Sequence, residues 1–165
     1  MGNTNADPHP TQDCDVRSPV SSKMPLRILV ADDHEIVRKG VKAVLEREGF
    51  KVVAEASNGE EAVARTLGFQ PDVVVLDLSM PRKNGIEAAR EILATIPKTK
   101  TILLTVHLED YYVRQALQSG IQGYVLKSRS SEDLLQAIHE VCRGMIYLSD
   151  GISPDVAREF LDKTD

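Results

Sequence analysis

Cysteine is scarce in this chain of 165 residues: only Cys14 and Cys142 occur, far apart in the sequence. Their separation matches no spacing of metal-binding cysteines, and it offers no framework of disulfides like that of a small secreted domain. The sequence therefore indicates neither a zinc site nor a disulfide scaffold. A reducing, cytoplasmic setting fits this cysteine usage best.

Long apolar runs and excess positive charge are also lacking. No stretch approaches the roughly 20 apolar residues needed to span a bilayer, and the amino terminus lacks the basic-then-apolar order of a secretory signal. The formal net charge is -5, whereas a protein that grips nucleic acid needs a basic face for the phosphates. We therefore expect neither a membrane partner nor direct contact with DNA by this chain.

The first 24 residues contain hardly any apolar side chains and are rich in Pro, Asp, Asn, Thr and Ser. Such a segment buries too little surface to offset its ordering entropy, so residues 1–24 are predicted to be a disordered tail. Met24 directly precedes the first apolar run and is a candidate alternative translation start.

From Leu26 onward, short apolar blocks alternate with stretches at helical spacing. Four nearly continuous blocks, rich in branched residues, occupy residues 28–31, 73–76, 102–104 and 124–126, and a less apolar one occupies residues 52–54. Blocks of this kind are typical of strands buried on both faces of a parallel sheet, with the weaker block nearer an edge. The pattern predicts five strands alternating with five helices in a doubly wound α/β domain over residues 25–143.

Residues 144–165 are predicted to be a linker and a short C-terminal helix. Gly144 and Gly151 flank the linker. Ser153 is a plausible N-cap, and Pro154 suits the first helical position. This segment is too short to be a second domain.

Polar residues follow four of the predicted strands: Asp32 and Asp33, then Asp77, Thr105 and Lys127. A parallel sheet brings the carboxyl ends of its strands to one rim, so these side chains are expected to meet. Taken singly, the acidic pair can be a helix cap and Asp77 a turn residue. Carboxylates about 5 Å apart repel by roughly 3 kcal/mol at an effective dielectric near 20, so three together indicate a cation. Mg²⁺, which takes oxygen ligands, is the natural one.

These residues resemble the pattern of bacterial response-regulator receiver domains. The segment Asp77-Leu78-Ser79-Met80-Pro81 with Gly85 is similar to the family's phosphorylation-site segment, and the acidic pair, Thr105 and Lys127 complete the pattern. The resemblance implies a flavodoxin-like sheet with strand order 2-1-3-4-5 and five flanking helices. It implies no enzyme beyond Mg²⁺-dependent self-phosphorylation from a donor and autodephosphorylation.

The resemblance also implies a role for each matching residue. Asp77 would accept a phosphoryl group from a sensor histidine kinase, beside Mg²⁺ held by Asp32, Asp33, Asp77 and the backbone carbonyl of Ser79. Lys127 would pair with the phosphoryl oxygens. Thr105 and Tyr124 would form the conformational switch, and the side chains of Ser79 and His107 would tune the lifetime of the phosphoryl bond.

The closest resemblance is to the NarL/FixJ subfamily, in which Ser128 after Lys127 is normal although many receivers have proline there. That subfamily usually continues into a LuxR-type helix-turn-helix, and we expect DNA contact only through such an output domain, which these residues lack. A homodimer formed on phosphorylation is expected through the final helix and the helix near Glu109, which carries Tyr111, Tyr112, Val113 and Leu117, although core packing explains the same residues.

Two other functions remain as alternatives. A pseudo-receiver would act as a protein-interaction module without phosphorylation, but degenerate receivers generally lose one of the five site residues. A flavodoxin-like small-molecule binder or a related phosphatase would need a Gly-rich phosphate loop, or a second Asp two residues after Asp77, and the sequence has neither.

Overall fold

The computed structural model describes residues 24–161, so the predicted tail and Cys14 lie outside the described residues, apart from Met24. The strands are β1 (Arg27–Ala31), β2 (Lys51–Ala56), β3 (Val73–Leu76), β4 (Lys100–Thr105), β5 (Gly123–Leu126) and β6 (Tyr147–Leu148). The helices are α1 (Glu35–Arg47), α2 (Gly59–Phe69), α3 (Gly85–Thr95), α4 (Asp110–Gln118), α5 (Ser131–Cys142) and α6 (Pro154–Leu161).

All strands belong to one parallel sheet with the order β2-β1-β3-β4-β5-β6. The predicted order of the first five strands is confirmed, and β2, the least apolar block, is indeed an edge strand. The prediction of five strands was wrong by one, because β6 pairs with β5 through Gly123 with Tyr147 and Tyr124 with Leu148. A strand of two half-buried residues leaves too short a pattern to be seen in the sequence.

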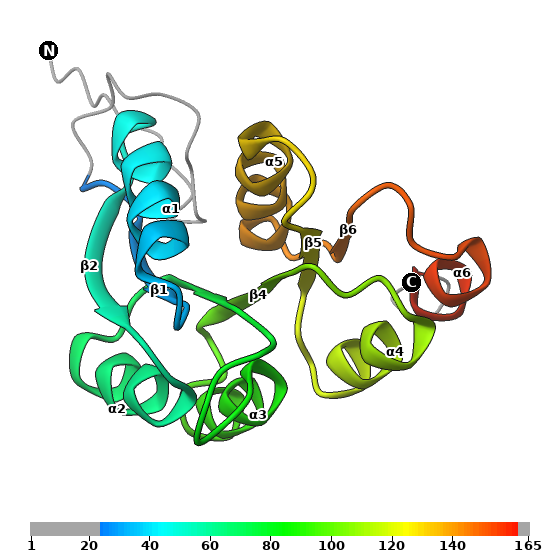
Figure 1. Ribbon diagram of the computed structural model, residues 1–165, viewed down its shortest axis with the longest axis horizontal. Coiled ribbons are helices and arrows are strands. Elements are labelled where there is room, and N and C mark those ends of the chain that lie inside the picture. Colours follow the sequence, from blue (N-terminus) through cyan, green and yellow to red (C-terminus); the bar gives the residue numbers. More distant parts are fainter. Residues whose placement is uncertain (1–23, 162–165) are drawn as a thin grey trace, which may run out of the picture.

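Helices cover both faces of the sheet, as the buried apolar strands require. Figure 1 shows α1 and α5 on one face and α2, α3 and α4 on the other, with α6 beside α4. Side chains alternate between two cores: Ile28 and Val30 of β1 join the α1–α5 side, while Leu29 and Ala31 join the opposite side. The doubly wound α/β prediction is therefore confirmed.

The segment after residue 143 is more than a linker. Besides forming β6, it returns as α6 to pack against α4, where Val156 is fully buried and Phe160 is 9% exposed. Arg114 of α4 and Glu159 of α6 form an ion pair of 3.1 Å between Nε and Oε2. The short C-terminal helix was thus predicted, but its packing into the main core was not.

The apolar side chains of α4 divide between core and surface. Val113 and Leu117 are buried in the core, so core packing explains them, whereas Tyr111 is 63% exposed. Within residues 24–161, no helix combines the length and the apolar character that a membrane span requires.

Candidate functional site

Asp32 and Asp33 lie in the loop between β1 and α1, at the carboxyl edge of the sheet. Asp32 is only 3% exposed, and its Oδ1 accepts a hydrogen bond of 2.8 Å from the backbone N–H of His34. The backbone N–H of Asp32 donates to the carbonyl of Ala56 in β2 at 3.0 Å. Asp32 therefore holds the residue that precedes α1, but no side-chain hydrogen bond caps the helix, whose N-cap is His34, so the helix-cap interpretation of the pair was wrong. The pair instead faces the rim of the sheet.

Asp77 follows β3 on the same rim and is 5% exposed. The chain behind it is closely packed: a Cβ added to Gly85 would lie 2.3 Å from the carbonyl oxygen of Asp77. Gly85 also closes the loop, because its N–H donates to the carbonyl of Leu78 at 2.9 Å. Glycine at this position is what lets α3 begin directly against the backbone of Asp77.

Lys127, after β5, connects the two buried carboxylates. Its Nζ lies 2.8 Å from Oδ2 of Asp32 and 3.3 Å from Oδ1 of Asp77. Burial would lower the pKa of Lys127, but its hydrogen bond to Asp32 and the charge of Asp77 outweigh burial and raise that pKa. The ammonium group is therefore fixed in its charged form at the centre of the site.

The surroundings of Asp77 disfavour its charged form. Burial raises the pKa of Asp77 above its ordinary value and repulsion from Asp32 raises it further, while Lys127 opposes the rise. One lysine thus compensates only part of the negative charge gathered here. A bound cation would stabilise the carboxylates by compensating the negative charge that Lys127 leaves.

The side chains of Asp32, Asp33, His34 and Asp77 offer ligand atoms that all lie within 4.8 Å of one another. Three of the four are carboxylates, the hard oxygen donors that suit Mg²⁺. Asp33 and His34 are exposed, so the cluster opens to solvent on one side. The donor set fits a partly hydrated Mg²⁺, and it confirms that the predicted carboxylates meet.

His34 was not among the predicted site residues. Its Nδ1 lies 3.2 Å from Asp33 and 3.4 Å from Asp32. The consecutive Asp-Asp-His sequence was the signal that could have indicated it, although its side chain, 68% exposed, stands at the outer edge of the cluster.

Thr105 and Tyr124 are joined through the backbone of His107. Thr105, fully buried at the end of β4, accepts a hydrogen bond of 3.1 Å from the N–H of His107. The hydroxyl of Tyr124 donates to the carbonyl of His107 at 2.7 Å. Burial raises the pKa of Tyr124, whose ring is fully buried in the core. The two predicted switch residues therefore share one residue of the β4–α4 loop.

The side chains of Ser79 and His107 touch, with 3.0 Å between Oγ and Nε2. Nδ1 of His107 lies 3.7 Å from Glu109, and the ring packs 4.8 Å from that of Tyr112. The structure thus brings together the two residues predicted to tune the phosphoryl lifetime. Near Lys127, every peptide bond is trans, as throughout the described residues, so Ser128 imposes no cis geometry there.

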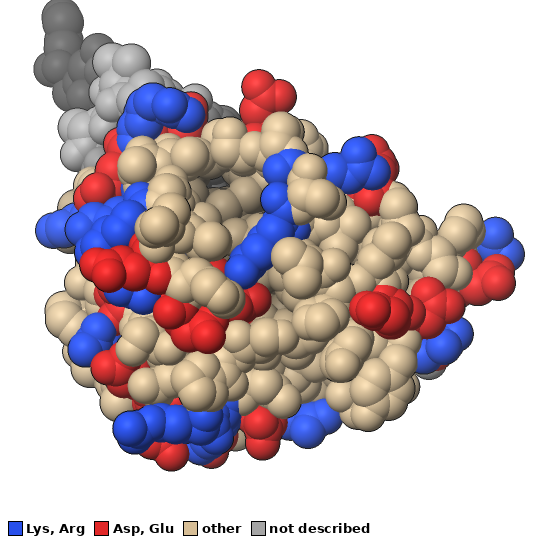
Figure 2. Space-filling view, in the orientation of Figure 1, with Lys and Arg blue, Asp and Glu red and all other residues tan. Residues whose placement is uncertain are grey.

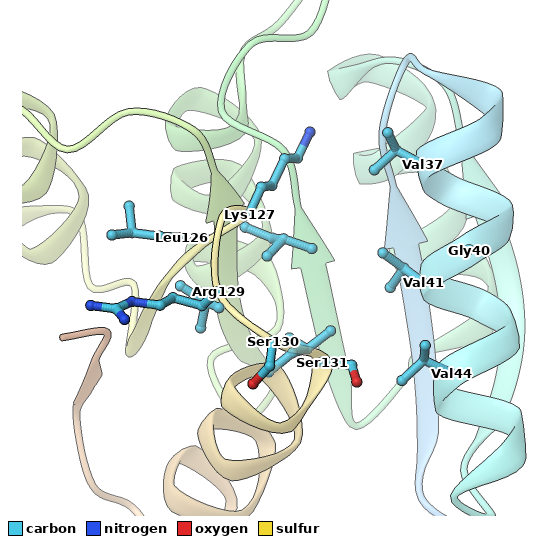
Figure 3. A pocket seen from close by; sticks show the side chains of 12 residues that line it. Val37, Gly40, Val41, Val44, Leu126, Lys127, Arg129, Ser130 and Ser131 are labelled. Atoms are coloured by element: carbon cyan, nitrogen blue, oxygen red, sulfur yellow. The ribbon is translucent and has the colours of Figure 1, made fainter. Parts of the chain in front are cut away.

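A cavity of about 400 Å³ lies beside the site, between α1 and α5. Figure 2 shows this face hollowed between the two helices, with basic side chains along the hollow and acidic ones below it. In Figure 3, Val37, Val41 and Val44 project from α1 toward the cavity, and Lys127 lines it from the end of β5. The cavity is mainly apolar and adjoins the charged site, with which it shares Lys127.

A doubly wound parallel sheet with an aspartate cluster and one lysine at its carboxyl edge defines a receiver-type signalling domain. Comparison with protein families agrees: residues 28–139 match the response regulator receiver domain. The chain belongs to this family, and its relatives place it among the receivers of LuxR-type regulators.

Two similar relatives show the extent of the match. The transcriptional regulatory protein DegU of Brevibacillus brevis is 35% identical over 136 residues, covering 82% of this chain and 58% of that protein. The response regulator UvrY of Escherichia coli O157:H7 is 39% identical over 133 residues, covering 80% and 61%. The chain thus spans about three fifths of the length of these two relatives.

Solved structures agree with the fold. A two-component response regulator of the LuxR family from Aurantimonas sp. SI85-9A1 is 36% identical with a TM-score of 0.73, covering 85% of this chain and 98% of that one. The signal receiver domain of the putative response regulator NarL from Mycobacterium tuberculosis is 32% identical with a TM-score of 0.71, covering 74% and 99%.

Proposed function

We propose that this receiver accepts a phosphoryl group on Asp77 from a sensor histidine kinase, in a reaction that requires Mg²⁺. The observation that carries the proposal is the burial of Asp77 among like charges, next to a single fixed lysine. Phosphoryl transfer needs positioning and charge neutralisation more than elaborate covalent chemistry. The arrangement supports positioning, and Lys127 supports part of the neutralisation. Bound Mg²⁺ would neutralise charge on the phosphoryl oxygens.

The chain's own residues take distinct parts in the transfer. A carboxylate oxygen of Asp77 attacks phosphorus, the bond from phosphorus to the donor's histidine nitrogen breaks, and its electron pair stays on that nitrogen. Lys127, already 3.3 Å from Asp77, pairs with the phosphoryl oxygens. Asp33, Asp77 and the backbone carbonyl of Ser79 would hold the metal, and Asp32 would act mainly through bound water.

The switch follows from a new partner for the hydroxyl of Thr105. In the present arrangement that hydroxyl accepts from the N–H of His107. A phosphoryl group on Asp77 would offer strong acceptor oxygens to the proton of the same hydroxyl, and movement of Thr105 toward them would draw it away from His107. Because Tyr124 holds the carbonyl of His107, the ring and the β4–α4 loop respond together. Ser79 and His107, by their contact, set how readily water reaches the phosphoryl group.

The output is proposed by the same reasoning. Some relatives are transcriptional regulators, so we infer control of transcription through a DNA-binding domain that is not part of residues 24–161. Phosphorylation would favour a homodimer through the β4–α4 region, where Val106, Leu108 and Tyr111 expose 70%, 45% and 63% of their surface. Sedimentation of phosphorylated and untreated protein tests this, and an unchanged monomer would remove the dimer.

Intact-mass measurement tests the phosphoacceptor. Protein treated with acetyl phosphate and Mg²⁺ should gain one phosphoryl group, and the gain should disappear in Asp77→Asn. Asp72→Asn, at the opposite end of β3, is the matched control and should gain as much as the unmodified protein. No gain with any donor would favour the pseudo-receiver. A gain that persists in Asp77→Asn would place the phosphoryl group on another residue.

A further inference from the structure

The side chain of Arg38 in α1 joins the acidic loop to strand β2. Its Nε forms an ion pair with Oε1 of Glu55 at 3.0 Å, and its Nη1 donates to the backbone carbonyl of Asp32 at 2.8 Å. The side chain is only 14% exposed. The N–H of Asp32 donates to the carbonyl of Ala56 in β2, and the carbonyl of Asp32 accepts from Arg38 of α1, which is itself paired with Glu55 of β2.

Glu55 is a permanent anchor for this contact. Burial alone would raise the pKa of Glu55, but hydrogen bonds from Lys39, Arg38 and Lys42 outweigh it and lower that pKa to about 2. Glu55 therefore keeps its charge at any pH at which the protein would work. In the described part of the chain, Arg38 is the one cation of these three that also bonds the loop carrying Asp32.

We propose that Arg38, anchored by Glu55, is a positioning residue for the metal site. This inference rests on the proposed function, because it concerns Mg²⁺ at the acidic pair. Mg²⁺ demands nearly ideal octahedral geometry, and groups that orient metal ligands typically change affinity by about 10–100-fold. Holding the peptide of Asp32 fixes the direction in which Asp32 and its neighbour Asp33 present their carboxylates.

Charge alone predicts the opposite effect, which makes the proposal easy to test. Arg38 is a cation bonded to a residue of the acidic cluster, so by electrostatics its removal should strengthen the binding of Mg²⁺. If Arg38 acts by position, its removal should weaken binding. The shape of arginine is also needed for this role. Its planar guanidinium bonds two partners at once, whereas the ammonium of lysine is a compact point charge.

The experiment measures Mg²⁺ affinity without any phosphodonor, by calorimetric titration of the full chain with MgCl₂. Arg38→Ala should weaken binding by about 10-fold or more, and Arg38→Lys should fail to restore it. Lys39→Ala is the matched control: Lys39 is adjacent in sequence and binds the same carboxylate at 3.0 Å. Its removal should leave the affinity within about twofold or slightly strengthen it.

Equal or tighter binding by Arg38→Ala would overturn the proposal, leaving the proposed function intact. If unmodified protein bound no Mg²⁺, the metal assignment itself would fail and this inference with it. Should circular dichroism show that Arg38→Ala does not fold, Glu55→Gln decides, because it keeps the side-chain volume and removes only the anchor's charge. Weaker Mg²⁺ binding by folded Glu55→Gln supports the proposal, and unchanged binding overturns it.

Discussion

Replacing Glu55 with glutamine is expected to destabilise the domain by about 2–3 kcal/mol at neutral pH. The pKa of Glu55 falls from 4.5 to about 2 in the folded protein, after the hydrogen bonds of three cations have outweighed burial. Each unit of pKa corresponds to about 1.4 kcal/mol of preference for the charged form. The expected loss is set below the full value that this pKa difference implies, because Lys39 is 53% exposed and solvent screens its charge.

The stabilisation by Glu55 should depend on pH. The folded-state pKa of Glu55 is depressed, so its contribution is fully present above about 4.5 and is lost as the pH falls toward about 2. Glutamine does not titrate in this window. The difference in unfolding free energy between the two proteins should therefore stay constant above about pH 4.5 and shrink steadily as the pH falls from there toward about 2.

Urea unfolding followed by circular dichroism, at several pH values from neutral to acidic, measures this difference. Glu46→Gln, which changes an exposed carboxylate near the end of helix α1, is the control and should change stability by less than about 0.5 kcal/mol at every pH. A loss in Glu55→Gln that stays constant as the pH falls would refute the electrostatic reasoning and assign the effect to packing.

Two further changes test the site and the C-terminal packing. Asp77→Asn should raise the unfolding free energy at neutral pH, because burial and Asp32 raise the pKa of Asp77 and its charged form destabilises the fold. The gain in unfolding free energy should vanish as acid protonates Asp77. An equal gain at all pH values would contradict this reasoning. Val156→Ala should cost about 2 kcal/mol in urea unfolding, since Val156 is fully buried under α4. The exposed Arg158→Ala on the same helix is its control, and equal losses in both would show that α6 is not docked.

Strand-end reasoning predicted most of the site because backbone direction alone brings those residues together. Asp32, Asp77 and Lys127 are separated in sequence, yet a parallel sheet leaves their strands at one rim, and their side chains are in contact there. Ser79 and His107, two residues after Asp77 and Thr105, were named from the family resemblance and not from strand ends. Their hydrogen bond depends on loop conformation, which local pattern does not encode.

The features that sequence reasoning missed depend on contacts between distant segments. Arg38 and Glu55 read as ordinary solvated charges on a helix and an edge strand, and only the packing of α1 against β2 turns them into a bridge. Strand β6 is similar: Ser149 accepts from the N–H of Leu126 at 3.0 Å, and Asp133 of α5 accepts from the hydroxyls of Tyr147 and Ser149. Hydrogen bonds of polar side chains fix this strand in place, so the sequence has no apolar pattern that would predict it.

The two edges of the sheet bear on how copies of this protein can meet. An exposed edge strand invites pairing with another chain and, in the extreme, aggregation. Here β6 offers only two residues of edge. The opposite edge, β2, shifts register against β1 between Ile28 and Leu29, carries the charges of Lys51 and Glu55, and has the carbonyl of Glu55 already bonded to Arg65. Strand addition is disfavoured on both sides, so reversible assembly is left to the helical faces.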